Sequence, residues 1–292
     1  MKKKIASVVL LLTMSVSLVA CGNNDTAQKS GAKEAEVKEA DISASEVMAK
    51  MSDSSESVEG VDASVSINFD ADITVGDETK KVAVKGDMDV KSNADPVEAY
   101  VNADMSIKAD KESSDIKYEV YMIAEDDMCK VYFGNDTDGW MSTEKSLDEL
   151  GLGDIDDLTG NMDEIKEYYT EENIDSYFEN VKVTEKKIDG KTCYSVKGDI
   201  AEDLLDTAID SLSALAGSTV DIPNVKISLE VCTDKETGSP VELNIKADVA
   251  ENDMIKVSAC ELSFKYNGNE KQDITVPDEA LDAPDISGLG LY

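Results

Sequence analysis

One motif in the chain has the residue types and spacing of a covalent catalyst. Ser142 and Lys145 stand at the Ser-x-x-Lys spacing of serine acyl transfer, in which the lysine helps to activate the hydroxyl. The same spacing recurs at two other places in this chain, which is rich in both residues, and neither Ser-Asp-Asn nor Lys-Thr-Gly occurs. A chance match is therefore the better interpretation, and we expect no catalytic residue here.

A second motif, Asp136-Thr137-Asp138-Gly139, looks like part of a calcium-binding loop. Aligning Gly139 with the loop glycine puts Gly134 at the first ligand position and Lys145 at the last, where calcium needs carboxylates. The motif therefore predicts a hairpin turn. Pairs of carboxylates such as Asp126-Asp127 arise without selection among 63 acidic residues. An acidic glycoside hydrolase remains a third alternative, although one Trp and four Phe offer little surface for sugar stacking.

The composition excludes several classes of function. The 292 residues include 63 acidic and 28 basic side chains, a net charge of −35, and every basic residue is lysine. Without histidine there is no imidazole base and no histidine metal ligand, and without arginine there is no bidentate clamp for phosphate. The acidic excess also argues against nucleic acid as a partner. We expect a protein without enzymatic activity, cofactor or metal.

The cysteines that follow Cys21 are too far apart for a zinc site, because no Cys-x-x-Cys occurs. Cys129 alternates in phase with Val131 and Phe133, which predicts a small buried residue. Cys193 and Cys232 fall in phase with polar residues and should point outward. If their strands are neighbours, a Cys193–Cys232 disulfide is one alternative, and free thiols are the other.

The amino terminus has the parts of a secretory signal: Lys2 to Lys4, then an apolar run from Ile5 to Val16 that is too short to span a bilayer. Leu18-Val19-Ala20-Cys21 is similar to the lipobox of bacterial lipoproteins. That resemblance implies cleavage after Ala20, a diacylglyceryl group on Cys21 and acylation of the new terminus. Two acyl chains would hold the protein on the membrane. Lysine without arginine is typical of an AT-rich genome and favours a Gram-positive bacterium. With the lipid anchor, this predicts that the protein lies on the outer face of the cytoplasmic membrane.

These patterns divide the chain into three parts. They are a signal peptide at 1–20, an acylated cysteine and flexible tether at 21–41, and one folded domain at 42–292. The domain begins with Ser43-Ala-Ser-Glu46, a capping box that predicts a helix to about Val58. Further helices are predicted at 162–169 and 172–180. The most amphipathic one is capped by Asp199 and Glu202, runs to Ala216 and ends at Gly217.

From Val61 to Val75 apolar and polar residues alternate, the period of a strand with one buried face. Strands with the same alternation are predicted at 82–90, 97–107, 116–122, 128–133, 181–188, 192–197, 225–231, 241–249 and 255–266, and a short last one at 274–277. The polar faces are too charged to be buried, so the apolar face needs a cover of helices. The expected fold is α+β: a curved antiparallel sheet of about ten strands, an unclosed β-barrel, with helices packed on its concave apolar face.

The order of signal, lipobox, tether, helix, meander and inserted helices resembles the LolA/LppX-type lipoproteins. Val131-Tyr132-Phe133 with Gly139-Trp140-Met141, and Ile274 to Ala280, are similar to uncharacterised Gram-positive lipoproteins of this group. The resemblance implies an apolar cavity that holds a lipid or lipopeptide, although the chain lacks arginine, on which a LolA-type carrier relies.

Two interpretations of the apolar stripe stay open. The first is a ligand cavity in a lipoprotein that binds or carries an apolar ligand. The second is a solid core in a surface adhesion, interaction or envelope-sensing protein, whose protein partner the sequence does not identify. The predicted lining residues are Val65, Ile67, Phe69, Val101, Met105, Val120, Met122, Leu205, Ile209 and Leu212.

Overall fold

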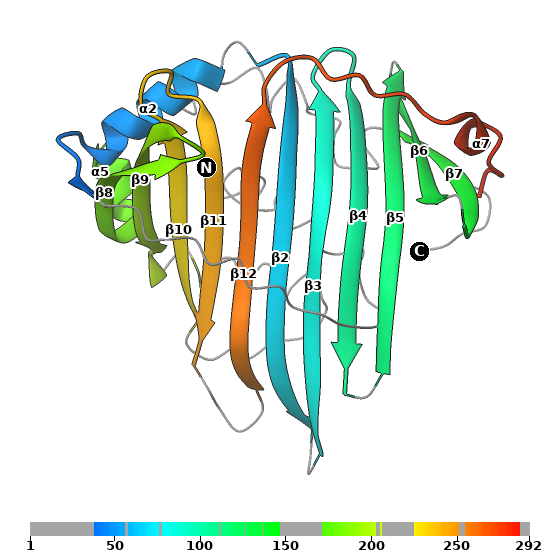
Figure 1. Ribbon diagram of the computed structural model, residues 1–292, viewed down its shortest axis with the longest axis horizontal. Helices are drawn as coiled ribbons and strands as arrows, with labels where there is room; N and C mark the ends of the chain where they lie inside the picture. Colours follow the sequence, from blue (N-terminus) through cyan, green and yellow to red (C-terminus); the bar gives the residue numbers. More distant parts are fainter. Residues whose placement is uncertain are drawn as a thin grey trace.

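The described chain is built around one open sheet (Figure 1). The computed structural model describes residues 38–55, 58–75, 78–110, 112–125, 127–135, 137–146, 171–202, 205, 225–250 and 255–286. Its twelve strands are all antiparallel and follow the order β1-β8-β9-β10-β11-β12-β2-β3-β4-β5-β6-β7. The end strands β1 and β7 are not paired with each other, so the sheet is unclosed.

Ten of the strands, β2 to β6 and β8 to β12, lie where the alternating pattern predicted them, and most extend beyond it by a few residues; β1 and β7 were not predicted. Their bounds are β1 Lys38–Glu39, β2 Gly60–Val75, β3 Glu78–Asn93, β4 Glu98–Ala109, β5 Glu112–Glu125, β6 Met128–Asn135, β7 Gly139–Ser146, β8 Phe178–Ile188, β9 Lys191–Ile200, β10 Val225–Asp234, β11 Pro240–Val249 and β12 Ile255–Gly268. The number of strands is twelve rather than about ten. One extra strand, β1, comes from residues that the composition assigned to the tether.

The helix α2, Ala44–Ser55, begins as predicted. The backbone N–H of Ser43 donates to Glu46 Oε2 over 3.0 Å, and the N–H of Glu46 donates to Ser43 Oγ over 3.3 Å, which is the reciprocal arrangement of a capping box. Hydrogen bonds from Ser43 lower the pKa of Glu46. The helix lies against β8, β9 and α5, Glu171–Tyr177. Its fully buried Val47 anchors it there.

Gly238 shows how closely α2 approaches the sheet. This glycine has φ +76°, and a Cβ there would lie 2.6 Å from the carbonyl oxygen of Lys50. Lys50 Nζ lies 5.6 Å from the ring centre of Tyr194, which shares a face with Val196 and Val231. The helix α2 therefore covers the apolar face at the β8–β10 end of the sheet.

The chain after β12 covers part of the other face. Residues 269–286, here called the C-terminal cover, run along one end of the strands from β12 to β7 (Figure 1). Asn93 fixes the cover at β3, where its side chain accepts from the N–H of Gln272 over 2.7 Å and donates to the carbonyl of Gln272 over 2.9 Å. Ser142 fixes it at β7 through a parallel bridge with Asp285.

Two expectations about the ends of elements are wrong. Residues 274–277 do not form a strand, and they lead into the helix α7, Asp278–Leu281. Their apolar side chains pack on an aromatic cluster instead of joining the sheet. Asp199 does not cap a helix, because it lies in β9 and accepts hydrogen bonds there. Glu202 and Leu205 are helical, and residues 206–216 lie outside the described chain.

The fold class needs a correction as well. In the described part of the chain the protein is mostly β, with short helices, rather than α+β. The helices do not all pack on the apolar face, because α7 packs on the other one. None of the described helices is long and apolar enough to cross a membrane. The predicted signal, Cys21 and most of the tether precede residue 38, and the predicted helix at 162–169 also lies outside the described residues.

Candidate functional site

The sheet register brings the predicted lining residues of the β-strands onto one face. Residues paired directly across an antiparallel ladder point to the same side. Val101 pairs with Val90 and with Val120, and Met105 pairs with Gly86, which pairs with Ile67. The same pairing places Val65, Phe69 and Met122 on this face. It continues across the other half of the sheet through Phe264, Leu243 and Val231.

Burial along this face is uneven. Val65 is 3% exposed and Met105 is 4% exposed, whereas Ile67, Phe69, Val101, Val120 and Met122 are only half-buried. Met105 packs over Gly86, where a Cβ would lie 2.8 Å from its Cγ. Leu205 is buried, and Ile209 and Leu212 lie outside the described residues. The strand residues thus form one apolar surface, while its relation to the predicted helix stays a prediction.

The opposite face carries an aromatic cluster at one end that the sequence analysis missed. Tyr121, Tyr132, Trp140 and Ala280 form a buried core cluster between β5, β6, β7 and α7. The ring centres of Tyr121 and Trp140 are 5.9 Å apart, and those of Tyr100 and Tyr121 are 4.7 Å apart. Alternation had assigned this face to solvent, because charged residues alternate with the apolar ones over most of β2 to β5.

Glu119 satisfies the two tyrosine hydroxyls of this cluster. Tyr100 donates to Glu119 Oε2 over 3.2 Å, and Tyr121 donates to the same oxygen over 3.1 Å. Burial, together with the Glu119 carboxylate, raises the pKa of Tyr100 and that of Tyr121. The indole N–H of Trp140, in contrast, is buried and has no hydrogen-bond acceptor.

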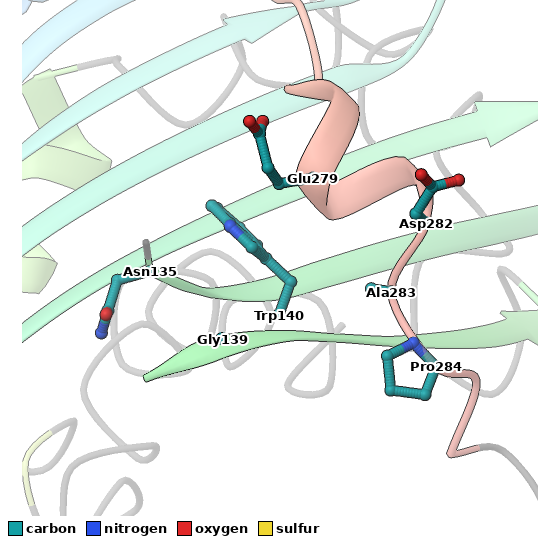
Figure 2. A pocket seen from close by; sticks show the side chains of 7 residues that line it. All are labelled: Asn135, Gly139, Trp140, Glu279, Asp282, Ala283 and Pro284. Carbon is teal, nitrogen blue, oxygen red and sulfur yellow. The ribbon is translucent and has the colours of Figure 1, made fainter. Parts of the chain in front are cut away.

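A pocket of about 570 Å³ opens beside Trp140, within the size range of small-molecule sites. Figure 2 shows the indole ring standing between Asn135 and Glu279, with Asp282 at the other end of α7. The lining residues are Asn135, Gly139, Trp140, Glu279, Asp282, Ala283 and Pro284. A second pocket of about 300 Å³ lies between α2 and the turn at Gly238. Neither pocket is lined by the predicted cavity residues.

A polar cluster lies on the same face in the other half of the sheet. It consists of Lys186, Cys193, Ser195, Glu230 and Cys232, here called the Lys186–Glu230 cluster. Glu230 Oε1 accepts from Lys186 Nζ over 2.8 Å and from Ser195 Oγ over 2.5 Å. Burial alone would raise the pKa of Glu230, but these hydrogen bonds outweigh it and hold the pKa below its usual value. For Lys186, burial lowers the pKa, but the hydrogen bond to Glu230 and the interactions with Cys232 together outweigh burial, so the pKa is raised.

The two cysteines of this cluster are free thiols. Their strands β9 and β10 are neighbours, as a disulfide would require, and Cys232 pairs with Ser195 while Cys193 pairs with Asp234. The expectation that both point into solvent is wrong, because each is 0% exposed. Burial raises the pKa of Cys232 to about 11, which keeps it an unreactive thiol. Cys129 is buried as predicted.

The Ser-x-x-Lys motif and the calcium-like motif both have structural roles. Ser142 lies in β7, where its hydroxyl donates to the carbonyl of Ala283 over 3.3 Å, and Lys145 is three residues further along the strand, on the opposite face. The calcium-like segment is a hairpin turn: Asn135 Oδ1 accepts from the N–H groups of Thr137 and Asp138, both over 2.8 Å. No three His, Cys, Asp or Glu side chains among the described residues are placed to hold a metal ion.

Comparisons with known proteins place most of the chain in one family. The family model described as a family of unknown function, DUF6612, matches residues 43–285, from the start of α2 to the end of the C-terminal cover. No curated protein matches the chain. Among solved structures, a DUF1329 family protein from Desulfovibrio piger aligns with 80% of this chain and 94% of its own, at 11% identity and a TM-score of 0.14. That likeness is too weak to bear on the fold.

Proposed function

We propose that this chain, which belongs to the DUF6612 family, is a membrane-anchored extracytoplasmic lipoprotein that binds a lipid or another apolar ligand without catalysing a reaction. The site is the apolar face of the sheet, in the manner of LolA/LppX-type proteins. The anchor is the acylated Cys21, and the location is the outer face of the cytoplasmic membrane of a Gram-positive bacterium.

One observation carries the ligand-binding part of this proposal. Four side chains of the apolar face, Ile67, Phe69, Val101 and Val120, are only half-buried, although Val65 and Met105 beside them are buried. A solid core would bury such side chains more completely, since each fully buried Val, Ile or Phe contributes about 1.5–3 kcal/mol. Acyl chains laid along this face would remove the remaining apolar area from water.

Native mass spectrometry of the full chain after gentle extraction tests this part. The expected result is a co-purifying lipid, or saturable binding of a fatty acid. Val101→Phe should weaken that binding, because the larger side chain occupies the half-buried surface. Asn102→Gln, its neighbour on the opposite face, is the matched control and should bind as the wild type does. If wild-type protein retains no lipid and binds no apolar dye, the face is a solid core, and a role in adhesion or envelope sensing replaces the proposal.

The anchor is tested separately by Cys21→Ala. The variant should appear in the soluble or released fraction, because without the diacylglyceryl group it carries neither of the two acyl chains that stable anchoring requires. Cys260→Ala, which removes a thiol from the folded domain, should stay with the membrane. Retention of Cys21→Ala in the membrane fraction would contradict the lipobox interpretation while leaving the ligand site untouched.

A further inference from the structure

A group of lysines meets at the end of the apolar face that α2 covers. Lys50 of α2 and Lys235, which follows β10, both approach the ring of Tyr194, with Nζ 5.6 Å and 5.2 Å from the ring centre. Lys235 Nζ also donates to Glu185 Oε1 over 2.7 Å. Lys38 pairs with Glu185 across the β1–β8 ladder. This group, here called the Tyr194 cluster, thus contains three lysines and one carboxylate, in a chain whose net charge is −35.

The positive charge of the Tyr194 cluster is only partly neutralised by its own carboxylate. The hydrogen bond from Lys235, together with the charge of Lys38, lowers the pKa of Glu185, so that this side chain stays ionised and offsets one ammonium group. Lys50 makes no ion pair with any described residue. The face of an aromatic ring attracts a cation without removing its charge, so Lys50 can still pair with an anion.

The Tyr194 cluster is continuous with the apolar face. Tyr194 lies two residues before Val196 in β9, so both side chains point to the same side of the sheet. From there the face passes over Leu243 and Phe264, which pair with each other and are half-buried, to β2. Four strand spacings separate β9 from β2, about 19 Å, a distance that one palmitoyl chain spans.

The chain that leads from Cys21 joins the fold at the same end. The strand β1 is the first described element, it pairs with β8, and residues 22–37 lie between it and Cys21. Figure 1 shows β8, β9 and α2 at one end of the sheet and β7 with α7 at the other. A lipid anchor on Cys21 would therefore be attached beside the Tyr194 cluster.

We propose that the ligand of the apolar face is an anionic lipid and that the Tyr194 cluster binds its head group. Lys50 and Lys235 pair with the negative charge of the head group, a phosphate or a carboxylate. The acyl chain extends from Tyr194 over Leu243 and Phe264 toward β2. Because it concerns the head-group end of the same site, this proposal rests on the proposed function.

Native mass spectrometry of the full chain in detergent tests the proposal. The probe is an equimolar mixture of dipalmitoyl phosphatidylglycerol, which is anionic, and dipalmitoyl phosphatidylcholine, which has the same chains but is zwitterionic. We expect about tenfold more bound phosphatidylglycerol than phosphatidylcholine at low ionic strength. The preference should fall as salt is added, because salt screens exposed charges.

Variants of the cluster locate the effect. Lys50→Gln should reduce the preference about threefold, and the double variant Lys50→Gln, Lys235→Gln should remove it. Glu236→Gln should raise the preference about twofold, because Glu236 and Asp53 line the pocket beside Lys50 and lower the positive potential there. Lys85→Gln is the matched control: it removes an exposed lysine from the opposite face, in β3, and should leave the preference unchanged. Circular dichroism confirms that each variant is folded.

Two results would overturn this proposal and leave the proposed function intact. The first is equal retention of the two lipids by the wild type. The second is an unchanged preference in the double variant, which would place the head group elsewhere. If the wild type retains neither lipid, the proposed function fails together with this proposal.

Discussion

The charged face of the sheet buries side chains in two regions, and it does so by different means. At β5–β7, large aromatic rings lie under a separate segment, the C-terminal cover, with Ala280 of α7 fully buried against them. At β9 and β10, the buried residues are small, Cys193, Ser195 and Cys232. There the long side chains of Lys186 and Glu230 lie over them and are 20% and 27% exposed.

This difference separates two sources of stability on one surface. The aromatic region depends on apolar area, which is largely independent of pH and salt. The Lys186–Glu230 cluster depends on a partly buried ion pair, which is screened less than exposed pairs but fails when one partner is lost. A face that looks uniformly polar in sequence is therefore stabilised by apolar packing in one half and by electrostatics in the other.

The largest expected effect is at Trp140. Trp140→Ala removes the ring that packs on Tyr121 and α7, and should lower the free energy of unfolding by about 4 kcal/mol. Urea denaturation followed by circular dichroism measures it. Met141→Ala is the matched control, since Met141 is the next residue along β7 but is 41% exposed on the other face; its effect should stay below about 0.5 kcal/mol. A loss of less than about 1 kcal/mol for Trp140→Ala would show that the C-terminal cover does not stabilise the sheet.

Glu230→Gln tests the other region. It leaves the Lys186 ammonium partly buried without a counter-ion and should cost about 2–3 kcal/mol. Asp104→Asn breaks an ion pair of similar length on the same face, between Lys117 and Asp104 at 2.8 Å, but these side chains are 74% and 61% exposed. Its cost in the same urea experiment should be below about 0.5 kcal/mol. Equal costs for the two variants would mean that burial does not distinguish the two pairs.

Asp199 extends the electrostatic region toward the end of β9 and gives it a pH dependence. Its carboxylate accepts from Ser228 over 2.6 Å, from Lys226 over 2.9 Å and from Asn180 over 2.9 Å. These hydrogen bonds lower the pKa of Asp199 to about 2. Because the folded-state pKa lies below that of the unfolded chain, the stabilisation is complete above about pH 5 and is lost as the pH falls toward 2.

The expected size of this loss is about 2 kcal/mol, from a shift of roughly two pKa units. Asp199→Asn should flatten the dependence of the unfolding free energy on pH between about 5 and 2 by that amount. Asp104→Asn serves as the control, because its carboxylate is largely exposed. If the Asp199→Asn profile runs parallel to that of the wild type, the carboxylate does not carry the acid sensitivity of this region.

The strands were predictable because a strand with one buried face alternates apolar and polar residues along the sequence. Ile67, Phe69, Val101 and Val120 share a face for the same reason that they alternate with polar residues. The capping box at Ser43 is similarly local, since both of its hydrogen bonds lie within four residues. What alternation leaves open is which distant segment covers a face, because that depends on contacts far apart in the chain.

Residues 274–277 show this limit. Ile-Thr-Val-Pro alternates like a strand, yet Ile274 and Val276 pack on the cluster around Tyr121 and Trp140, which are more than a hundred residues earlier. The same limit applies to Cys193 and Cys232: their phase predicted the correct face but not the ion pair that lies over them. One local signal pointed to the aromatic cluster. Three large aromatic residues, Tyr121, Tyr132 and Trp140, occupy positions that alternation assigns to the polar face.

The smallest expected effect compares two buried serines, one in each region, and both 2% exposed. Ser195 donates to the Glu230 carboxylate over 2.5 Å, whereas Ser142 donates to the neutral carbonyl of Ala283 over 3.3 Å. Hydrogen bonds to charged groups are the stronger, so Ser195→Ala should cost about 1.5 kcal/mol and Ser142→Ala about 0.5 kcal/mol.

Ser142→Ala should also leave the C-terminal cover in place. Two backbone hydrogen bonds hold it there: the N–H of Ser142 donates to Pro284 over 3.0 Å, and the N–H of Ile286 donates to Ser142 over 2.8 Å. Amide hydrogen exchange at Ser142 and Ile286 should therefore stay close to that of the wild type. Equal losses of stability in the two serine variants would mean that both regions rely on the same kind of interaction, and the contrast between them would then fail.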